Sequence, residues 1–294
     1  MQKIHKTVLP TAAVEALALK PGAFVIDATL GSGGHSREII KRIGCSGSLL
    51  AIDVDPDAIA VAEKEFEKLP HVSLRVGNFR TIDKYATENS VDAILADLGW
   101  RTEQFTLSGR GFSFKSDEPL LMTLGDPKEY AFTAYDIVNE WSVETLHNII
   151  RGYGEERFVK RIVDAIDAAR KVKPIESAKE LGDIIMKAVP SFARHGRIHP
   201  ATKTFQALRV AVNDELGALD DFITNSWKIL KSGGRLAVIS FHSLEDRIIK
   251  HRFKDFATAR LGELPYRKPH LPSSEECEQN PRARSAKLRT IIKT

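Results

Sequence analysis

The sequence predicts an α/β fold in which a parallel sheet carries helices on both faces. Short apolar segments alternate with segments of helical periodicity early in the chain, a pattern typical of parallel strands joined by crossover helices. A glycine-rich loop follows the first apolar segment, as in folds that bind nucleotide-like cofactors. The chain has 294 residues, enough for one large α/β domain or for a domain with an insert. The early strand candidates are residues 23–28, 49–52, 72–76 and 91–96.

Two helical segments connect the first three strands. We expect residues 36–43 to form the first helix, which Gly44 closes, and residues 56–69 to form the second. Asp55 supplies an N-cap for the second helix, and Pro56 suits its first position.

The pattern changes after residue 105, where helical runs replace the alternation. These runs cover residues 134–150, 155–171, 178–188 and 204–219. A strand returns at residues 235–241 after a Lys-Ser-Gly-Gly turn, and a last strand candidate spans residues 286–293 beyond a long loop at residues 264–285. We therefore expect a discontinuous α/β core interrupted by a helical insert. The core would comprise residues 1–105 and 204–294, and the insert residues 106–203.

The composition is that of an ordinary globular protein, with 43% hydrophobic and 28% charged residues. The net charge of +4 is only a weak indication that the protein binds a polyanionic partner. Cys45 and Cys277 lie far apart, so neither a disulfide framework nor a paired-cysteine metal site is expected. The chain shows no signal-peptide pattern and no apolar run long enough for a bilayer, and we expect a cytoplasmic protein without membrane contact. The oligomeric state stays open, a dimer being one option.

The glycine loop at residues 28–35 does not match the dinucleotide fingerprint G-x-G-x-x-G, because Ser36 stands where the third glycine belongs. This disfavours NAD and FAD, whose diphosphate needs that glycine. A cofactor without phosphates, such as S-adenosylmethionine, fits better. The alternative interpretation is a tight structural turn.

Polar and aromatic residues follow the next strands. Asp53 ends the second strand, where open α/β sheets bind ligands, and is a candidate for binding ribose hydroxyls. Phe79 follows the third strand and would lie against an adenine ring, or else belong to the core. Asp97 ends the fourth strand and would accept hydrogen bonds from an amino group of cofactor or substrate, and Gln104 is a second polar candidate nearby.

Two further features suit an anionic substrate. His242, after the fifth strand, would bind phosphate or move a proton; equally, Ser243 would cap the next helix with Asp246 at N3. Clustered basic residues can contact a nucleic-acid backbone, although a solvated charged face is their usual meaning. The clusters are Arg282, Arg284, Lys287, Arg289 and Lys293, and Arg194, His195, Arg197, His199 and Lys203.

Together these segments resemble the family of ribosomal RNA small-subunit methyltransferase H, also called MraW. Motifs matching the family in order lie at residues 5–9, 27–36, 97–99, 110–114, 153–158, 199–202, 204–209, 240–247 and 280–285. The resemblance covers almost the whole chain. It implies a class I S-adenosylmethionine-dependent methyltransferase core, Rossmann-like, with an inserted helical domain that recognises RNA. The implied reaction is methylation of the exocyclic N4 of a cytidine in the decoding centre of 16S rRNA.

The family's binding positions carry over residue by residue. Cofactor binding is implied for Gly33, Gly34, His35, Asp53, Phe79, Asp97 and Gln104. We add Asp97 as the catalytic candidate, because accepting an N4–H hydrogen bond would localise electron density on that nitrogen. His242, Arg282 and Arg284 are candidates for substrate contacts. No metal is required, because the sulfonium already carries the leaving group.

The chain departs from the family pattern twice, at residues 100–102 and at residues 117–125, where two acids and an arginine are absent. If the second segment supplies catalytic groups, activity or target choice changes. The alternatives are therefore an RNA-binding ribosome assembly factor that has lost transfer, or a methyltransferase acting on another nucleic acid. A nicotinamide dehydrogenase is remote, since the fingerprint glycine is missing.

Overall fold

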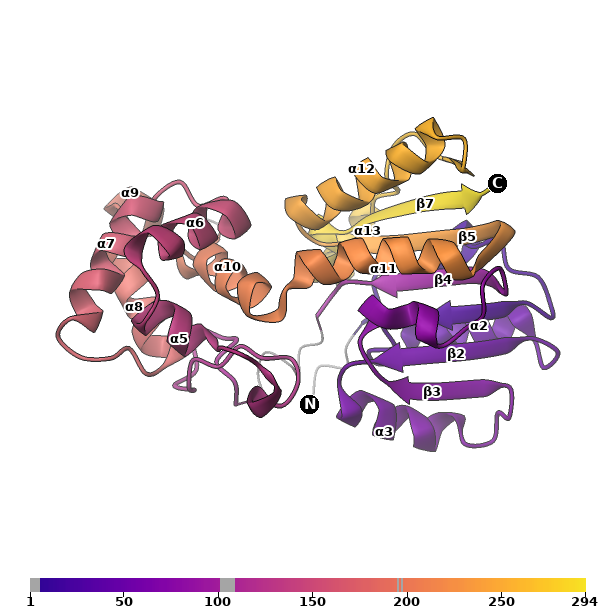
Figure 1. Ribbon diagram of the computed structural model, residues 1–294, viewed down its shortest axis with the longest axis horizontal. Coiled ribbons are helices and arrows are strands. Elements are labelled where there is room, and N and C mark those ends of the chain that lie inside the picture. Colours follow the sequence, from indigo (N-terminus) through magenta and orange to yellow (C-terminus); the bar gives the residue numbers. More distant parts are fainter. Residues whose placement is uncertain (1–5, 101–108, 195, 197) are drawn as a thin grey trace. The chain divides into compact units, whose positions relative to one another are not determined.

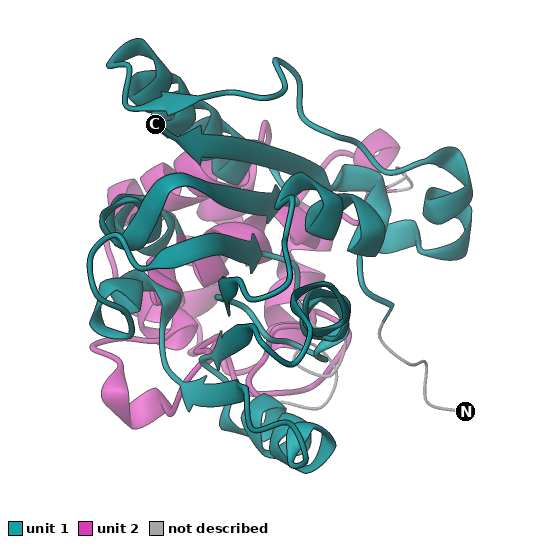
Figure 2. Cartoon of the chain, turned by 90° about the vertical axis from the view of Figure 1, so that its right-hand side faces the viewer, with its two compact units in different colours: residues 1–101, 216–294 teal, residues 102–215 magenta. Residues whose placement is uncertain are grey.

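The computed structural model describes residues 6–100, 109–194, 196 and 198–294, which form two compact units. Unit 1 comprises Met1–Arg101 and Leu216–Thr294, and unit 2 comprises Thr102–Glu215 (Figure 2). The boundary after Glu215 lies beyond the expected one at residue 203. Helix α10 (Ala201–Asn213) belongs to unit 2 because it packs against α6 (Val143–Gly154).

Unit 1 is built on one sheet with the strand order β3-β2-β1-β4-β5-β7-β6. Strands β1 to β5 are parallel, whereas β7 pairs antiparallel with both β5 and β6. Figure 1 shows the strands from β3 to β7 side by side in this order. The expected α/β class is confirmed. The strands are β1 (Phe24–Asp27), β2 (Ser48–Asp53), β3 (Val72–Val76), β4 (Val91–Asp97), β5 (Leu230–Ser240), β6 (Gly262–Glu263) and β7 (Lys287–Lys293).

Alternate residues of each strand enter different cores, because successive side chains of a strand point to opposite faces. Val25 and Leu49 pack with helices α1 and α2, and Ala51 packs with α3. Ile26 and Leu50 pack on the other face with α11 and α12. Helices therefore cover both faces, as predicted. The elements are α1 (Pro10–Ala16), α2 (Gly34–Ile43), α3 (Pro56–Phe66), the 3-10 turn η1 (Phe79–Lys84), α11 (Glu215–Ile229) and α12 (Ser243–Thr258).

The cap predicted for α3 is present, since Asp55 Oδ1 accepts the Asp57 N–H at 2.9 Å with Pro56 in the first position. The predicted turn before the fifth strand differs. Strand β5 already begins at Leu230, and its pairing with β4 shifts register where Gly233 takes a φ of 79°. The glycines therefore form a bulge inside a longer strand.

The expected loop at residues 264–285 contains two short helical elements, α13 (Ser274–Gln279) and the 3-10 turn η3 (Pro281–Ser285). The Ser273 hydroxyl accepts the Glu276 N–H and so caps α13. The elements are short, and this explains why periodicity did not reveal them.

The regular elements of unit 2 are helices among its described residues, apart from one isolated bridge between Pro119 and Ser177. The helix expected at residues 134–150 is two helices, because Ser142 accepts the Thr145 N–H and starts α6 anew. The remaining elements are the 3-10 turn η2 (Pro127–Glu129), α5 (Ala134–Asn139), α7 (Val159–Arg170), α8 (Ala178–Ala188) and α9 (Ser191–Arg194). Among all described helices, none has both the length and the apolar character that a membrane span needs.

The segment that departs from the family pattern is part of the core of unit 2. Leu120, Met122 and Thr123 are fully buried, and Met122 adopts a positive φ of 55°. The Asn213 amide donates to the Met122 carbonyl at 2.7 Å and accepts the Leu124 N–H at 2.9 Å. Arg110 Nη1 donates to the Leu124 carbonyl at 2.6 Å. The segment therefore serves to pack and hold this unit.

Candidate active site

Three neighbouring parallel strands end in aspartates at one edge of the sheet. Asp27 ends β1, Asp53 ends β2 and Asp97 ends β4. These strands lie next to one another with β1 in the middle. Ligands of open α/β sheets bind outside this carboxyl edge, so the three carboxylates define the candidate active site.

Asp53 fastens the glycine loop to the second strand. Its Oδ2 accepts the Gly31 N–H at 2.7 Å, and its Oδ1 accepts the Asp55 N–H at 2.9 Å. Gly33 follows with φ 76°, which glycine adopts without strain, and serves as the N-cap of α2. No side chain of the described residues caps this helix, which begins directly after the glycine loop at the carboxyl end of β1.

His35 and Asp97 form a pair at the centre of this edge. His35 Nε2 lies 3.2 Å from Asp97 Oδ2, and Asp97 Oδ1 accepts the Gly99 N–H at 2.9 Å. The Asp97 N–H donates to the Thr29 hydroxyl, which anchors the strand end. Burial lowers the pKa of His35, but the hydrogen bond and charge of Asp97 outweigh it and raise the pKa above its usual range.

Asp27 is a site residue that the sequence did not single out. It is fully buried, accepts the Ser36 hydroxyl at 2.6 Å and accepts the Thr29 N–H at 3.3 Å. Burial raises the pKa of Asp27 to about 6, against the lowering effect of His35 and Ser36. An acid that ends an apolar strand just before a glycine loop was the available signal. Ser36, noted only for breaking the dinucleotide fingerprint, is its hydrogen-bond donor.

Phe79 lies at the start of η1 and packs edge-on against Phe222, with ring centroids 5.1 Å apart and an interplanar angle of 84°. The ring of Phe79 is partly buried against the hydrophobic core, so the interpretation of Phe79 as a core residue holds for the buried part of the ring. Gln104 lies outside the described residues.

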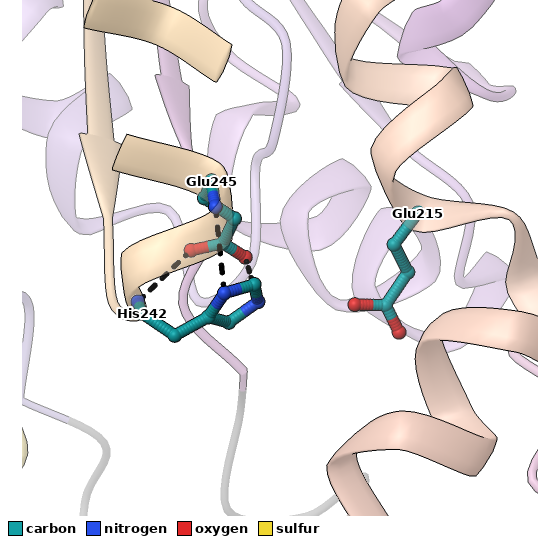
Figure 3. Close-up of side chains that lie close together, drawn as sticks. All are labelled: Glu215, His242 and Glu245. Carbon is teal, nitrogen blue, oxygen red and sulfur yellow. Dashed lines mark hydrogen bonds and ion pairs between the residues drawn. The ribbon is translucent and has the colours of Figure 1, made fainter. Parts of the chain in front are cut away.

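The structure corrects the expected start of α12. His242, not Ser243, is the N-cap, and Glu245, not Asp246, occupies N3 in the capping box. His242 Nδ1 faces the Glu245 N–H, His242 Nε2 lies 3.0 Å from Glu245 Oε1, and Glu245 Oε2 accepts two backbone N–H groups (Figure 3). Glu215, also drawn there, pairs with Arg209 in unit 2. Helix capping therefore engages Nδ1 of His242, whereas Nε2 is buried beside Glu245 without a hydrogen-bond partner among the described residues.

Ion pairs and hydrogen bonds engage much of the first basic cluster. Lys287 and Arg289 both pair with Asp246, at 2.9 and 2.7 Å. Lys293 Nζ donates to two backbone carbonyls and to an asparagine side chain. Arg282 and Arg284 remain exposed, with Arg282 donating to the Trp100 carbonyl at 3.2 Å.

The second basic cluster is also largely engaged within unit 2. Arg194 donates to backbone carbonyls at the end of α8, and Lys203 donates to the Glu155 carbonyl. His199 stacks on Phe114 with centroids 4.1 Å apart. His195 and Arg197 lie outside the described residues.

Gly34 should not tolerate a side chain. An ideal Cβ there would lie 1.7 Å from Thr7 Oγ1 and 2.8 Å from Thr7 Cβ. Gly34→Ala therefore pushes residue 7 away from α2, and we expect the free energy of unfolding to fall by about 1–3 kcal/mol in urea titrations. In a Thr7→Gly background the same change should cost less than half as much. Equal losses in both backgrounds would contradict the contact. Gly33→Ala serves as the matched control, because its strain comes from φ and should not depend on residue 7.

Comparisons with known proteins show the family of this chain. The profile of the MraW methylase family matches residues 2–294. Ribosomal RNA small subunit methyltransferase H of Synechocystis sp. is 46% identical over 289 residues, covering 97% of this chain and 92% of that protein. The protein of the same name from Limosilactobacillus fermentum is 42% identical over 310 residues, covering 98% and 97%.

A solved structure, that of PH0851, shares the fold with a TM-score of 0.50 at 13% identity, covering 99% of this chain and 47% of that one. The family match spans nearly the whole chain, and both relatives align over almost their full length. The chain belongs to the MraW methylase family.

Proposed function

We propose that this methyltransferase transfers the methyl group of S-adenosylmethionine to the exocyclic N4 of a cytidine in the decoding centre of 16S rRNA. Its curated relatives carry the name ribosomal RNA small subunit methyltransferase H, which supports an rRNA substrate. The observation that carries the proposal is the gathering of the glycine loop, His35 and the aspartates of three adjacent strands at one sheet edge.

The residues at this edge fit the cofactor. The uncapped first turn of α2, at Gly33 and Gly34, suits the carboxylate of its amino-acid part, since N–H groups at a helix start favour anions. Asp53 suits the ribose hydroxyls, because a carboxylate can accept several hydrogen bonds in addition to those from the Gly31 and Asp55 N–H groups. The partly exposed ring of Phe79 suits an adenine. When bound, S-adenosylmethionine supplies an electrophilic methyl group on a sulfonium sulfur.

Asp97 is the group proposed to orient the amine of the target base. Its side chain keeps 15% of its surface exposed, and His35 and the Gly99 N–H hold both oxygens in place. Asp97, or the carbonyl beside it, accepts one N4–H hydrogen bond and so directs the nitrogen lone pair at the methyl carbon. Positioning of this kind can supply about 7 kcal/mol or more of the barrier reduction. His35 acts as a positioning residue through Asp97.

The base must leave its stack to reach this edge. Unit 2 and the exposed Arg282 and Arg284 are proposed to grip the surrounding RNA, because cations contact the phosphate backbone. His242 is no longer favoured for this role, since the capping box engages its ring.

An assembly factor without transfer activity was suggested by the missing acids and arginine at residues 117–125. Leu120, Met122 and Thr123 in this segment are buried. Because the segment has a buried, structural role, we favour a family variant that still transfers methyl groups over an assembly factor that has lost methyl transfer.

Incorporation of tritiated methyl groups tests the proposal. We expect transfer from labelled S-adenosylmethionine to 30S subunits from a strain lacking this modification, and digestion to nucleosides should place the label on N4-methylcytidine. Free rRNA and DNA are run in parallel to separate other nucleic-acid targets. Cofactor binding without incorporation into any of these substrates would instead support the assembly factor.

A further inference from the structure

The outer edge of the sheet in unit 1 carries a second feature, which we call the basic groove. Helix α12, the segment after β6 and strand β7 border a cavity of about 270 Å³. Buried Phe253 and Thr290 form part of its wall, and no acidic side chain of the described residues lines it. Its cationic and aromatic lining residues are Lys250, Lys254, Tyr266, Arg267, Lys268 and Arg289.

Four of these cations are available to a ligand. Lys250, Lys254, Arg267 and Lys268 are exposed, and none of them forms an ion pair or hydrogen bond with the described part of the chain. Arg289 differs, because it is paired with Asp246. Four uncompensated positive charges around one cavity favour an anionic occupant with several charges.

The segment that carries Tyr266 is held at both ends. Strand β6 pairs with the end of β7, and His270 exchanges two backbone hydrogen bonds of 2.9 Å with Leu288. Pro265 and Pro269 restrict the backbone between these anchors. Tyr266 is nevertheless 59% exposed. An exposed aromatic ring among cations, on a backbone segment that is anchored at both ends, is an arrangement on which unpaired bases stack.

A second cavity in unit 1, lined by Trp227 and Phe256, is less suited to an anion. Its cations are engaged: Lys228 pairs with Asp83, Arg252 pairs with Asp220, and Lys293 donates to carbonyls. Of these two cavities, only the basic groove combines an exposed aromatic ring with cations that are unpaired among the described residues.

Strand β7 leads from the groove toward the carboxyl end of β5, the strand next to β4. Lys287 pairs in register with Ser240, at the carboxyl end of β5. Thr290 of the groove is three residues further along β7, roughly 10 Å at the rise of a strand. The exposed Arg282 and Arg284 precede β7 at that same end. A short stretch of RNA can therefore span from groove to active site.

We propose that the basic groove binds a single-stranded segment of the RNA substrate that flanks the target nucleotide. Lys250, Lys254, Arg267 and Lys268 contact its phosphates, and Tyr266 stacks on one of its bases. This inference rests on the proposed function and adds a binding surface to it.

The test compares two quadruple variants of the full chain. The groove variant carries Lys250→Ala, Lys254→Ala, Arg267→Ala and Lys268→Ala. The control variant carries Lys20→Ala, Arg42→Ala, Lys64→Ala and Lys68→Ala, which removes the same charge from exposed positions near α1, α2 and α3 that are unpaired among the described residues. Binding of a fluorescein-labelled single-stranded RNA with the decoding-centre sequence is followed by anisotropy across a salt series.

We expect the groove variant to bind this RNA about 10- to 100-fold more weakly at about 0.1 M salt, with the slope of log K against log salt reduced by about 3. The control variant should lose less than a third of that slope. Equal losses in both variants, or no loss in either, would overturn the proposal. A polyglutamate peptide that competes as well as unlabelled RNA would also overturn it, since the groove would then accept any polyanion.

Tyr266 gives an independent measurement if the quadruple variant folds poorly. Tyr266→Ala should weaken RNA binding about 5-fold or more, and Tyr266→Phe should restore it. Methyl incorporation into 30S subunits by the unaltered protein is measured alongside. If the protein incorporates methyl groups but the groove substitutions do not weaken RNA binding, this inference alone is wrong. If the groove substitutions weaken RNA binding but no methyl groups are incorporated, the proposed function alone is wrong.

Discussion

Replacing Asp97 with Asn should reduce methyl transfer by about 100-fold or more while leaving the fold intact, because the hydrogen bond that positions the amine is lost. The oxygen of the new amide can still accept the Gly99 N–H, so the strand end keeps its geometry. The carboxylate charge beside His35 disappears, and the amide NH2 group cannot accept the N4–H hydrogen bond. Single-turnover transfer to 30S subunits measures the loss.

Isothermal titration with S-adenosylmethionine separates the two roles open to Asp97. Asp53→Asn is the matched control, because it alters a carboxylate at the same edge that is proposed to hold the ribose. It should weaken cofactor binding with little change in transfer at saturating cofactor. An Asp97→Asn variant that keeps both cofactor affinity and transfer would disprove the assignment. A loss of affinity alone would make Asp97 a cofactor ligand only.

Replacing Asp27 with Asn should stabilise the protein at neutral pH. Burial raises the pKa of Asp27 from 3.8 to about 6, so the folded chain holds this proton more tightly than the unfolded chain does. As the pH rises from about 4 to about 6, the unfolded state loses the proton first and stability falls. The penalty is complete above about pH 6 and amounts to about 3 kcal/mol. The Asn oxygen can still accept the Thr29 N–H, and the Asn NH2 group can donate to the Ser36 hydroxyl. The hydroxyl then accepts the hydrogen bond that it donates to Asp27 in the unaltered protein.

Urea titrations between about pH 5 and about pH 8 test this dependence. The stability gained by Asp27→Asn should be about 3 kcal/mol at pH 7.5 and about half of that at pH 5. Ser36→Ala should act in the opposite sense, because it removes a donor to the carboxylate, and should destabilise the protein more at neutral than at acidic pH. A stability difference for Asp27→Asn that does not vary with pH would show that the carboxyl has an ordinary pKa.

Much of the architecture can be predicted along the chain. Some features depend only on residues that are near in the sequence, and local periodicity and capping chemistry reveal them. They are the apolar segments of β1 to β4, the Asp55 cap and the acids at strand ends. The parallel order of the strands also predicts that Asp53 and Asp97 lie at one edge. The bulge in β5 and the separation of α5 from α6 are not predicted, because a few residues decide each of them.

Side-chain partners are much harder to foresee. Arg289 pairs with Asp246 across 43 positions of sequence, and Asn213 binds the Met122 carbonyl across 91. The first pair neutralises one cation of the first basic cluster. The second holds the segment at residues 117–125, which departs from the family pattern, in the core of unit 2. Neither follows from spacing, because the contact exists only once distant elements have docked.

The sequence alone was therefore enough to predict the α/β class and the family, and the cofactor site that it predicts at the carboxyl edge of the sheet stays a proposal. The folded chain decided which charges are paired and which remain available. His242 is a helix cap, Asp27 is a buried acid with a raised pKa, and Lys250 and Lys254 lie with Tyr266 around one cavity. The reason is physical: backbone periodicity is a local property, whereas burial and ion pairing depend on every neighbour that packing brings within a few ångströms.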